Sequence, residues 1–308
     1  MFSMAEDRLP DSAVQWVVQS VDSEASIQSV EGMKGGTSSL LHRLSLQTDQ
    51  GNVPVVLRRF HKKEWLRQEP DLVRHEMESL RQAADVQLPT PDLIAGDETG
   101  NGCGMPAVLM TCLQGDVDLQ PENRAQWLDR LAEALVRIHD VPAEGFPWTY
   151  RPYIGKSDLR VPTWTRAPGA WQRALDRVMG AEPSFTPRFI HRDFHPANLL
   201  WSGGQVSGVV DWVNACQGPA AIDVGHCRVN LAMLFDVASA DQFLAAYQDY
   251  AGSAFCWDPY WDLLSLFDFG SPQVYAGWEA FGISGLTEGL IKERVDRYII
   301  TLVKQLSS

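Results

Sequence analysis

Three oxygen-bearing side chains stand at the ends of short apolar runs in the middle of the chain. Asp193 and Asn198 lie in the stretch 189–201, and Asp211 directly follows two valines. A carboxylate beside a reacting hydroxyl can position it and take its proton, while an amide oxygen and a second carboxylate can hold Mg²⁺ on nucleotide phosphates. The pattern therefore indicates metal-nucleotide chemistry, with Asp193 as the catalytic carboxylate and with Asn198 and Asp211 as the metal ligands.

The spacing of these residues resembles the catalytic and metal-binding loops of eukaryotic-like kinases. The chain reads H-x-D-x-x-x-x-N from His191 to Asn198, and an aspartate follows thirteen residues later. More closely, it resembles the aminoglycoside phosphotransferase and choline kinase family. The residues that carry this resemblance are 193–200, 210–212, 217–219 and 222–225. Protein kinases place Phe-Gly after the metal-binding aspartate, whereas this chain has Trp212-Val213.

The resemblance implies an α+β, protein-kinase-like bilobal fold. An N-terminal nucleotide-binding lobe, residues 1–113, would hold an antiparallel sheet plus a helix. A mainly helical C-terminal lobe, residues 114–308, would carry catalysis and acceptor binding. The implied activity is transfer of the γ-phosphoryl group of ATP or GTP, with Mg²⁺, to a hydroxyl of a small molecule. The family includes metabolic kinases and kinases that confer antibiotic resistance, so an aminoglycoside-, macrolide- or choline-like acceptor would each fit.

A loop rich in glycine and hydroxyl residues, 32–40, lies between two apolar strands near the N-terminus. Glycine lets a backbone approach phosphates closely, so Gly35, Gly36 and Ser38 are candidates for nucleotide binding. The run is not G-x-G-x-x-G, and an ordinary hairpin loop would have the same composition. Its position upstream of the catalytic motifs favours the phosphate cover.

The strand 53–60 contains two arginines where the resemblance expects a phosphate-binding lysine. Arg58 is the candidate for that role, because it lies over the lysine's place in the motif. Arginine binds phosphate bidentately and is always charged, but its geometry differs from that of lysine. A helix from about 71 to 84 carries Glu76 in a family-like Glu-x-x-x-Leu pattern. We expect Glu76 to pair with Arg58, although both arginines could simply be exposed charges at a strand end.

Two further sites follow from the resemblance alone. The strand ending at 106–115 resembles the hinge between lobes, where an adenine ring would bond to main-chain groups from Thr111 to Leu113. In related kinases the C-terminal helices supply the acceptor pocket. Four residues there could receive a protonated amine by charge and ring-face contact: Asp258, Asp262, Asp268 and Trp261. The acids among them could equally form a solvated helix face.

Two residues beside the central motifs refine the interpretation. Asp223 resembles a second carboxylate of the family, which supports the catalytic loop rather than touching metal. Arg192 stands where the family usually has glycine, and His191-Arg192-Asp193 is typical of a protein kinase. Since only about a dozen residues separate Asp211 from Asp223, there is no room for an activation segment. A small substrate is therefore expected rather than a protein.

The elements that must position these residues follow from apolar periodicity. The helix 121–139 is the best defined, with Trp127, Leu131 and Leu135 on one stripe and proline and glutamate at its start. We expect helices at 13–18, 71–84, 121–139, 240–251, 258–269 and 286–306. The segment 145–168 is expected to be irregular.

Composition narrows the class of protein. With 308 residues, 45% of them apolar, the chain can fill two lobes around a cleft. A net charge of -13 disfavours nucleic-acid and anionic-membrane partners; it fits a cationic substrate and also plain solubility. Five scattered cysteines without a C-x-x-C pair argue against a disulfide framework and a zinc site. The apolar runs are too short to span a bilayer, and the N-terminus does not resemble a signal peptide, so we expect a cytoplasmic protein.

One competing interpretation is a nucleotide-binding protein that transfers no phosphate, a pseudokinase. The missing lysine favours it, and the joint presence of Asp193, Asn198 and Asp211 opposes it. A protein kinase is the less favoured third possibility.

Overall fold

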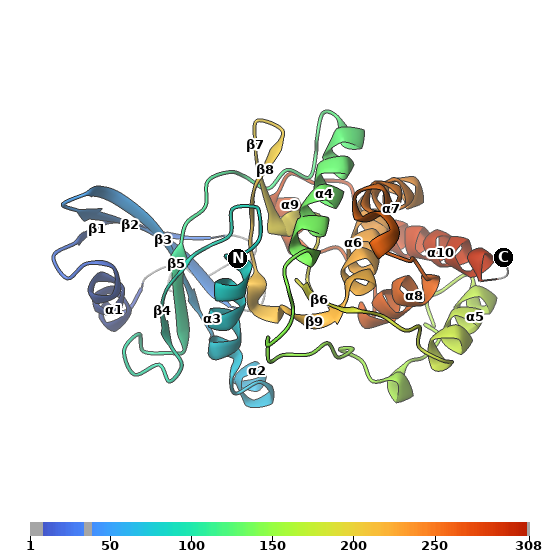
Figure 1. Ribbon diagram of the computed structural model, residues 1–308, viewed down its shortest axis with the longest axis horizontal. Coiled ribbons are helices and arrows are strands. Elements are labelled where there is room, and N and C mark those ends of the chain that lie inside the picture. Colours follow the sequence, from blue (N-terminus) through green and yellow to red (C-terminus); the bar gives the residue numbers. More distant parts are fainter. Residues whose placement is uncertain (1–8, 34–38, 307–308) are drawn as a thin grey trace. The chain divides into compact units, whose positions relative to one another are not determined.

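The computed structural model describes residues 9–33 and 39–306 and divides the chain into two compact units (Figure 1). The first unit comprises the chain up to Asp85, together with Pro89–Gln114 and Trp212–Asn214. The second comprises Val86–Leu88, Gly115–Asp211 and the chain from Ala215 onward. The main division falls after Gln114, one residue beyond the boundary expected from the sequence.

A five-stranded antiparallel sheet forms the centre of the first unit. Its strands are β1 (Ser26–Gly32), β2 (Leu40–Thr48), β3 (Gly51–Arg59), β4 (Leu93–Asp97) and β5 (Ala107–Thr111), in the spatial order β1-β2-β3-β5-β4. Strands β2 and β3 pair along their whole length, from Leu40 opposite Arg59 to Thr48 opposite Gly51. The turn between them uses Gly51 at a φ of 114°, which glycine adopts without steric cost.

The two faces of this sheet differ because side chains alternate along each strand. Val55 and Leu57 of β3 join a core that also contains Ala13 and Val17 of α1 (Asp11–Val21). Arg58 points to the opposite face, where it meets α3 (Leu72–Ala83). The short helix α2 (Lys63–Gln68) precedes α3.

The second unit is mainly helical. Its helices are α4 (Arg124–His139), α5 (Pro168–Met179), α6 (Ala220–Leu234), α7 (Val237–Ala251), α8 (Pro259–Asp268), α9 (Ala276–Ala280) and α10 (Glu288–Gln305). Helix α6 is buried on nearly all sides and packs against α7, α8 and α10. Gly225 of α6 permits the close approach of α8, since a Cβ there would come within 2.7 Å of the Ser265 Oγ.

Two short antiparallel ribbons in the second unit lead to the central motifs. Strand β6 (Pro187–Ile190) pairs with β9 (Cys216–Pro219), and β7 (Leu199–Ser202) pairs with β8 (Gln205–Val209). The 3₁₀ turns η1 (Lys156–Asp158), η2 (Pro196–Asn198), η3 (Trp212–Asn214) and η4 (Gly252–Ala254) complete the described elements.

The predicted α+β, kinase-like fold is confirmed, with the sheet in the N-terminal part and the helices in the C-terminal part. The helices expected at 71–84 and 121–139 are present, with ends that differ from the expected ones by at most three residues. Helices α2, α5, α6 and α9 were not expected. No helix within residues 9–33 and 39–306 is long and apolar enough to cross a membrane.

Candidate functional site

The turn at residues 191–193, which carries the predicted catalytic residue Asp193, follows β6 and is held by a carboxylate from α6. Asp223, whose exposure is 0%, accepts hydrogen bonds from the backbone N–H groups of His191 (2.7 Å) and Arg192 (2.8 Å). The turn needs this support because Arg192 has a φ of 69°, a conformation that costs a non-glycine residue about 1–2 kcal/mol. The residue expected from the sequence to support the loop thus does so.

Asp223 has a third partner on α4. His139 Nε2 lies 3.3 Å from Asp223 Oδ2, and His139 Nδ1 lies 2.7 Å from the Tyr247 hydroxyl. Burial alone would raise the pKa of Asp223, but the hydrogen bonds from His139 and from the His191 backbone outweigh it. The pKa therefore lies below its usual value, and the carboxylate stays ionised.

Replacing Asp223 with alanine is expected to destabilise the fold by about 3–5 kcal/mol, because two buried backbone N–H groups lose their acceptor. Asp249→Ala, an exposed change on α7, is the matched control and should have little effect. Urea denaturation at neutral pH measures both variants. The gap between wild type and Asp223→Ala should narrow as the pH falls below the ordinary carboxyl range, since a depressed pKa stabilises the fold only above that range. An Asp223→Ala protein as stable as wild type would contradict the assignment.

Asn198 and Asp211 lie together at one end of the β7–β8 ribbon. The ladder pairs Leu199 with Val209, and Val210 N–H donates to the Asn198 carbonyl at 3.0 Å, so Asp211 is the next residue beyond that bond. The Asn198 Nδ2 donates to the Asp193 carbonyl at 2.9 Å. This bond fixes the amide and turns its Oδ1 away from the Asp193 backbone. The structure thus brings the three predicted residues into one cluster within the second unit.

This donor set suits Mg²⁺. An amide oxygen and a carboxylate are hard ligands, and Mg²⁺ in nucleotide sites is held by one or two protein oxygens plus phosphates and water. Among the residues that the structure describes, no group of three or more His, Cys, Asp or Glu side chains could hold a metal by itself. One amide oxygen and one carboxylate leave coordination positions for phosphates and water, so the two residues fit a metal that arrives with a nucleotide.

Imidazoles surround the Asp193 carboxylate, whose side chain is 30% exposed. His226 Nε2 of α6 lies 3.2 Å from its Oδ1, and His195 Nε2 lies 3.8 Å from the same oxygen. Burial opposes ionisation of Asp193, but the hydrogen bond from His226 and the nearby His195 hold its pKa well below the usual range. His191 links this turn to the residue that follows β8, because its Nδ1 accepts from Asp193 N–H and its Nε2 lies 2.9 Å from the Val210 carbonyl. Asp193 is thus an ionised, oriented carboxylate at neutral pH.

Arg192 is buried and engaged within its own unit. Its side chain is 4% exposed, its Nη2 lies 2.9 Å from Asp268 Oδ2, and its guanidinium lies over the rings of Tyr150 and Tyr153 at 4.8 and 3.9 Å. Asp268 also accepts from the Ile154 backbone N–H at 3.2 Å. Arg192 therefore stabilises the strained turn. It is not an exposed binding site for a phosphorylated segment.

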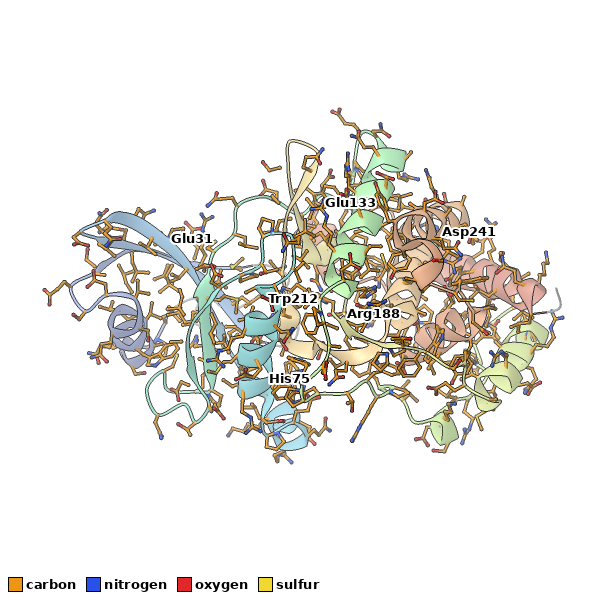
Figure 2. The ribbon with its side chains drawn as sticks, viewed as in Figure 1. Glu31, His75, Glu133, Arg188, Trp212 and Asp241 are labelled. Atoms are coloured by element: carbon orange, nitrogen blue, oxygen red, sulfur yellow. The ribbon has the colours of Figure 1, made fainter. Side chains whose placement is uncertain are left out.

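The other residues expected to bind the acceptor also have structural partners. Asp262, at 0% exposure, accepts from Arg228 (2.5 Å), Tyr298 (2.6 Å) and Trp257 (2.7 Å). Arg228 pairs with Asp241 as well, which is labelled in Figure 2.

Asp258 caps α8 by accepting from the Tyr260 N–H and pairs with Arg177 at 3.1 Å. Trp261 is 2% exposed and packs edge-on against Tyr260 and Phe185. These contacts hold the helices together, so both side chains are engaged within the second unit.

The predicted ion pair between Arg58 and Glu76 is present in the first unit. The Arg58 Nη1 lies 2.7 Å from Glu76 Oε1, with the side chains 5% and 1% exposed. Since β3 alternates its faces, Pro54 lies on the same face as Arg58. Gly35, Gly36 and Ser38 lie outside the described residues.

A cavity of about 430 Å³ opens on the face of the sheet in the first unit that carries Pro54 and Arg58. Its lining residues are Ser29, Glu31, Arg43, Ser45, Asn52, Pro54 and Gln114. Thr111 ends β5, where its hydroxyl accepts from the Asp92 N–H at 2.8 Å, and Leu113 directly precedes Gln114. Gln114 lines this cavity, whereas Thr111 and Leu113 are not among its lining residues.

Sequence reasoning missed His226 and His139. Both lie on helices, and neither stands at a recognisable spacing from Asp193 along the chain. The signal that could have found His226 is its position directly after the 222–225 motif.

The model of the phosphotransferase enzyme family matches residues 30–270. Among curated proteins, a homoserine kinase from Methylobacillus flagellatus is 29% identical over 221 residues, which are 65% of this chain and 64% of the relative. The chain thus spans less than two thirds of that relative's length.

Solved structures show the same fold at low identity. The macrolide 2'-phosphotransferase MphH from Brachybacterium faecium aligns with a TM-score of 0.59 at 16% identity, over 94% of this chain and 98% of that one. A thermostable mutant of aminoglycoside phosphotransferase APH(4)-Ia, solved with ADP and hygromycin B, aligns with a TM-score of 0.61 at 16% identity, over 94% and 98%.

Proposed function

Because this chain belongs to the phosphotransferase enzyme family, we propose that it is a small-molecule kinase that moves the γ-phosphoryl group of ATP to a hydroxyl. The observation that carries the proposal is the cluster of Asp193, Asn198 and Asp211, which the fold assembles around one strained turn and one strand end. A structural role alone would not require two non-glycine residues at positive φ beside these oxygens, as Arg192 and Asp211 are.

Asp193 is the proposed catalytic carboxylate. It is ionised near neutral pH, so it can accept a hydrogen bond from the acceptor hydroxyl, align that oxygen, and take its proton as the new P–O bond forms. Asn198 Oδ1 and the Asp211 carboxylate would hold Mg²⁺, which supplies charge neutralisation on the phosphates when bound. Asp223 and Arg192 keep the turn that carries Asp193 rigid. Positioning and electrostatics are the main contributions that a protein makes to such a reaction.

The first unit would bind the nucleotide. Arg58, fixed by Glu76, offers a guanidinium to the inner phosphates, and the cavity on the same sheet face would receive the base or ribose near Thr111 to Leu113. Gly35, Gly36 and Ser38 remain the proposed phosphate cover. ATP is favoured as the phosphate donor because the solved aminoglycoside phosphotransferase named above contains ADP. GTP is the alternative donor, and an assay in which ATP and GTP compete distinguishes the two.

Replacing Arg58 with methionine is expected to weaken Mg-ATP binding about 10- to 100-fold, the loss of one or two charge-assisted hydrogen bonds. Arg58→Lys keeps the charge and should lose less. Isothermal titration calorimetry with Mg-ATP measures the affinity of both variants. Thermal unfolding shows whether loss of the arginine that pairs with the buried Glu76 has destabilised the fold. If a folded Arg58→Met protein bound Mg-ATP as tightly as wild type, the role of Arg58 would be wrong.

The proposed acceptor is a small hydroxyl compound of amino-acid size, with homoserine as the leading candidate. Two observations favour it over a polycationic antibiotic. The curated relative quoted above is a homoserine kinase. The four residues expected to bind a polyamine are engaged in buried or capping contacts, so the acidic surface that a polycation needs is not offered by them.

A coupled assay of ADP release tests the function and the acceptor together. Purified protein with Mg-ATP is offered homoserine, choline, hygromycin B, a macrolide and a sugar alcohol in separate reactions. The proposal predicts acceptor-dependent ADP release with homoserine or a compound of similar size. Nucleotide binding without consumption over the whole panel would favour the pseudokinase interpretation, for which the arginine at position 58 is the one supporting feature.

A further inference from the structure

We propose that His226 is a positioning residue for Asp193: its Nε2–H holds one carboxylate oxygen of Asp193 and thereby presents the other oxygen to the acceptor hydroxyl. The inference rests on the proposed kinase function. It goes beyond that function because it gives a defined task to a residue outside the H-x-D-x-x-x-x-N and Val-Asp-Trp motifs.

Three imidazoles lie near the Asp193 carboxylate: those of His191, His195 and His226. His226 Nε2 lies 3.2 Å from Asp193 Oδ1, within hydrogen-bonding distance, whereas His195 Nε2 lies at 3.8 Å. His195 is also committed elsewhere, because its Nδ1 accepts from the Ala197 N–H at 3.2 Å and caps η2. His191 points its Nε2 at the Val210 carbonyl. His226 is therefore the imidazole that directly fixes the carboxylate.

Packing against the end of α8 fixes the ring of His226. Its ring stacks on Phe269 with centroids 4.7 Å apart and an interplanar angle of 28°, and its side chain is 12% exposed. Phe269 follows the last residue of α8, and Gly225 allows α6 to approach that helix closely. The ring is thus held between α8 and the catalytic turn in one orientation.

The end of α8 supports both Arg192 and, through His226, Asp193. Asp268 pairs with Arg192, and the next residue, Phe269, stacks on His226, which contacts Asp193. The end of α8 therefore determines both the backbone and the carboxylate of the proposed catalytic residue.

The hydrogen bond from His226 to Oδ1 restricts rotation of the Asp193 carboxylate about χ2, because that rotation would break the bond. The remaining oxygen, Oδ2, is then the one that accepts the substrate proton. The charged and titratable groups around Asp193 are His191, His195, His226, Tyr153 and Tyr275. A mispositioned carboxylate should lower turnover and leave nucleotide binding intact, because loss of alignment by about 1 Å can cost about 10²-fold in rate.

The test compares His226→Leu, His226→Asn and His226→Gln. Glutamine places an amide N–H near the position of Nε2, asparagine is one methylene too short, and leucine has no donor. We expect kcat to fall about 10- to 100-fold in the leucine and asparagine variants and to recover to within about threefold of wild type in the glutamine variant. The KM for ATP should stay within about twofold in all three. The exposed His61→Leu is the matched control and should leave kcat unchanged.

A purely structural role would lower the melting temperature of all three variants without separating glutamine from asparagine. The inference is overturned if folded leucine or asparagine variants turn over at the wild-type rate, or if glutamine is as slow as they are. Crystal structures of wild type and His226→Leu supply a measurement that does not depend on turnover. We expect the Asp193 carboxylate to rotate in the variant, and an unchanged carboxylate would overturn the inference even if wild type proved inactive. An inactive wild type across the acceptor panel would instead count against the proposed function.

Discussion

Asp193→Asn is expected to lower kcat about 10³-fold or more, while the Kd for Mg-ATP stays within about threefold. The amide matches the carboxylate in size and can keep the hydrogen bond from His226 through Oδ1, so the fold should survive. It cannot accept the acceptor's proton, and this step supplies a factor of about 10²–10⁴ in comparable reactions.

Rapid-quench measurement of ADP formation in a single turnover gives the rate, and isothermal titration gives the Kd. Asp249→Asn, on the exposed side of α7, controls for the loss of a negative charge. Near-normal turnover by the Asp193→Asn enzyme would show that the proton leaves by another route, and the role of Asp193 would be wrong.

Asp211→Asn is expected to have the second-largest effect, a fall in kcat of about 10²-fold with a higher Mg²⁺ requirement. Asparagine tolerates positive φ nearly as well as aspartate, so the conformation of this residue at 69° is preserved. What changes is the charge of the proposed metal ligand, and an amide binds Mg²⁺ more weakly than a carboxylate.

Turnover measured over a Mg²⁺ series from micromolar to tens of millimolar separates this effect from misfolding. The variant should recover part of its rate at high Mg²⁺, whereas Asp193→Asn should not recover at any concentration. A Mg²⁺ dependence identical to that of wild type would remove Asp211 from the metal site.

Short motifs with chemical meaning were predictable from the sequence. Asp193, Asn198 and Asp211 could be singled out because each ends an apolar run and their spacing is set by one turn and one hairpin. The Arg58–Glu76 pair was also predictable, since a strand end and a helix with one inward face leave few partners. The family and the α+β, kinase-like fold are confirmed.

Helix α6 was missed because it is buried on nearly every side. A helix without a polar face has no period of 3.6 residues, so its sequence resembles a loop or a core strand. Helix α5 was missed for a different reason: two of the four residues on its buried stripe are Ala170 and Ala174, which leave only Trp171 and Val178 to mark an apolar pattern.

The partners of the acidic residues near the C-terminus could not be predicted from the sequence. Asp262 and Asp268 face Arg228 and Arg192, which lie 34 and 76 residues earlier in the chain. These pairings cannot be predicted from the linear sequence. In the sequence, an aspartate of a buried ion pair cannot be distinguished from one that lines a pocket for a cationic substrate. His226 also lies far from Asp193 along the chain, which is why the proposed positioning histidine emerged only from the fold.

The central claim is that Asn198 and Asp211 hold the metal of a bound nucleotide beside Asp193. A crystal structure with Mn²⁺ and a non-hydrolysable ATP analogue tests it most directly, since Mn²⁺ can be located by its anomalous scattering. The account predicts an anomalous peak about 2.0–2.2 Å from Asn198 Oδ1 and from an Asp211 oxygen, with the terminal phosphate facing Asp193. A bound nucleotide whose metal lies on other residues, or whose terminal phosphate lies away from Asp193, would contradict the account.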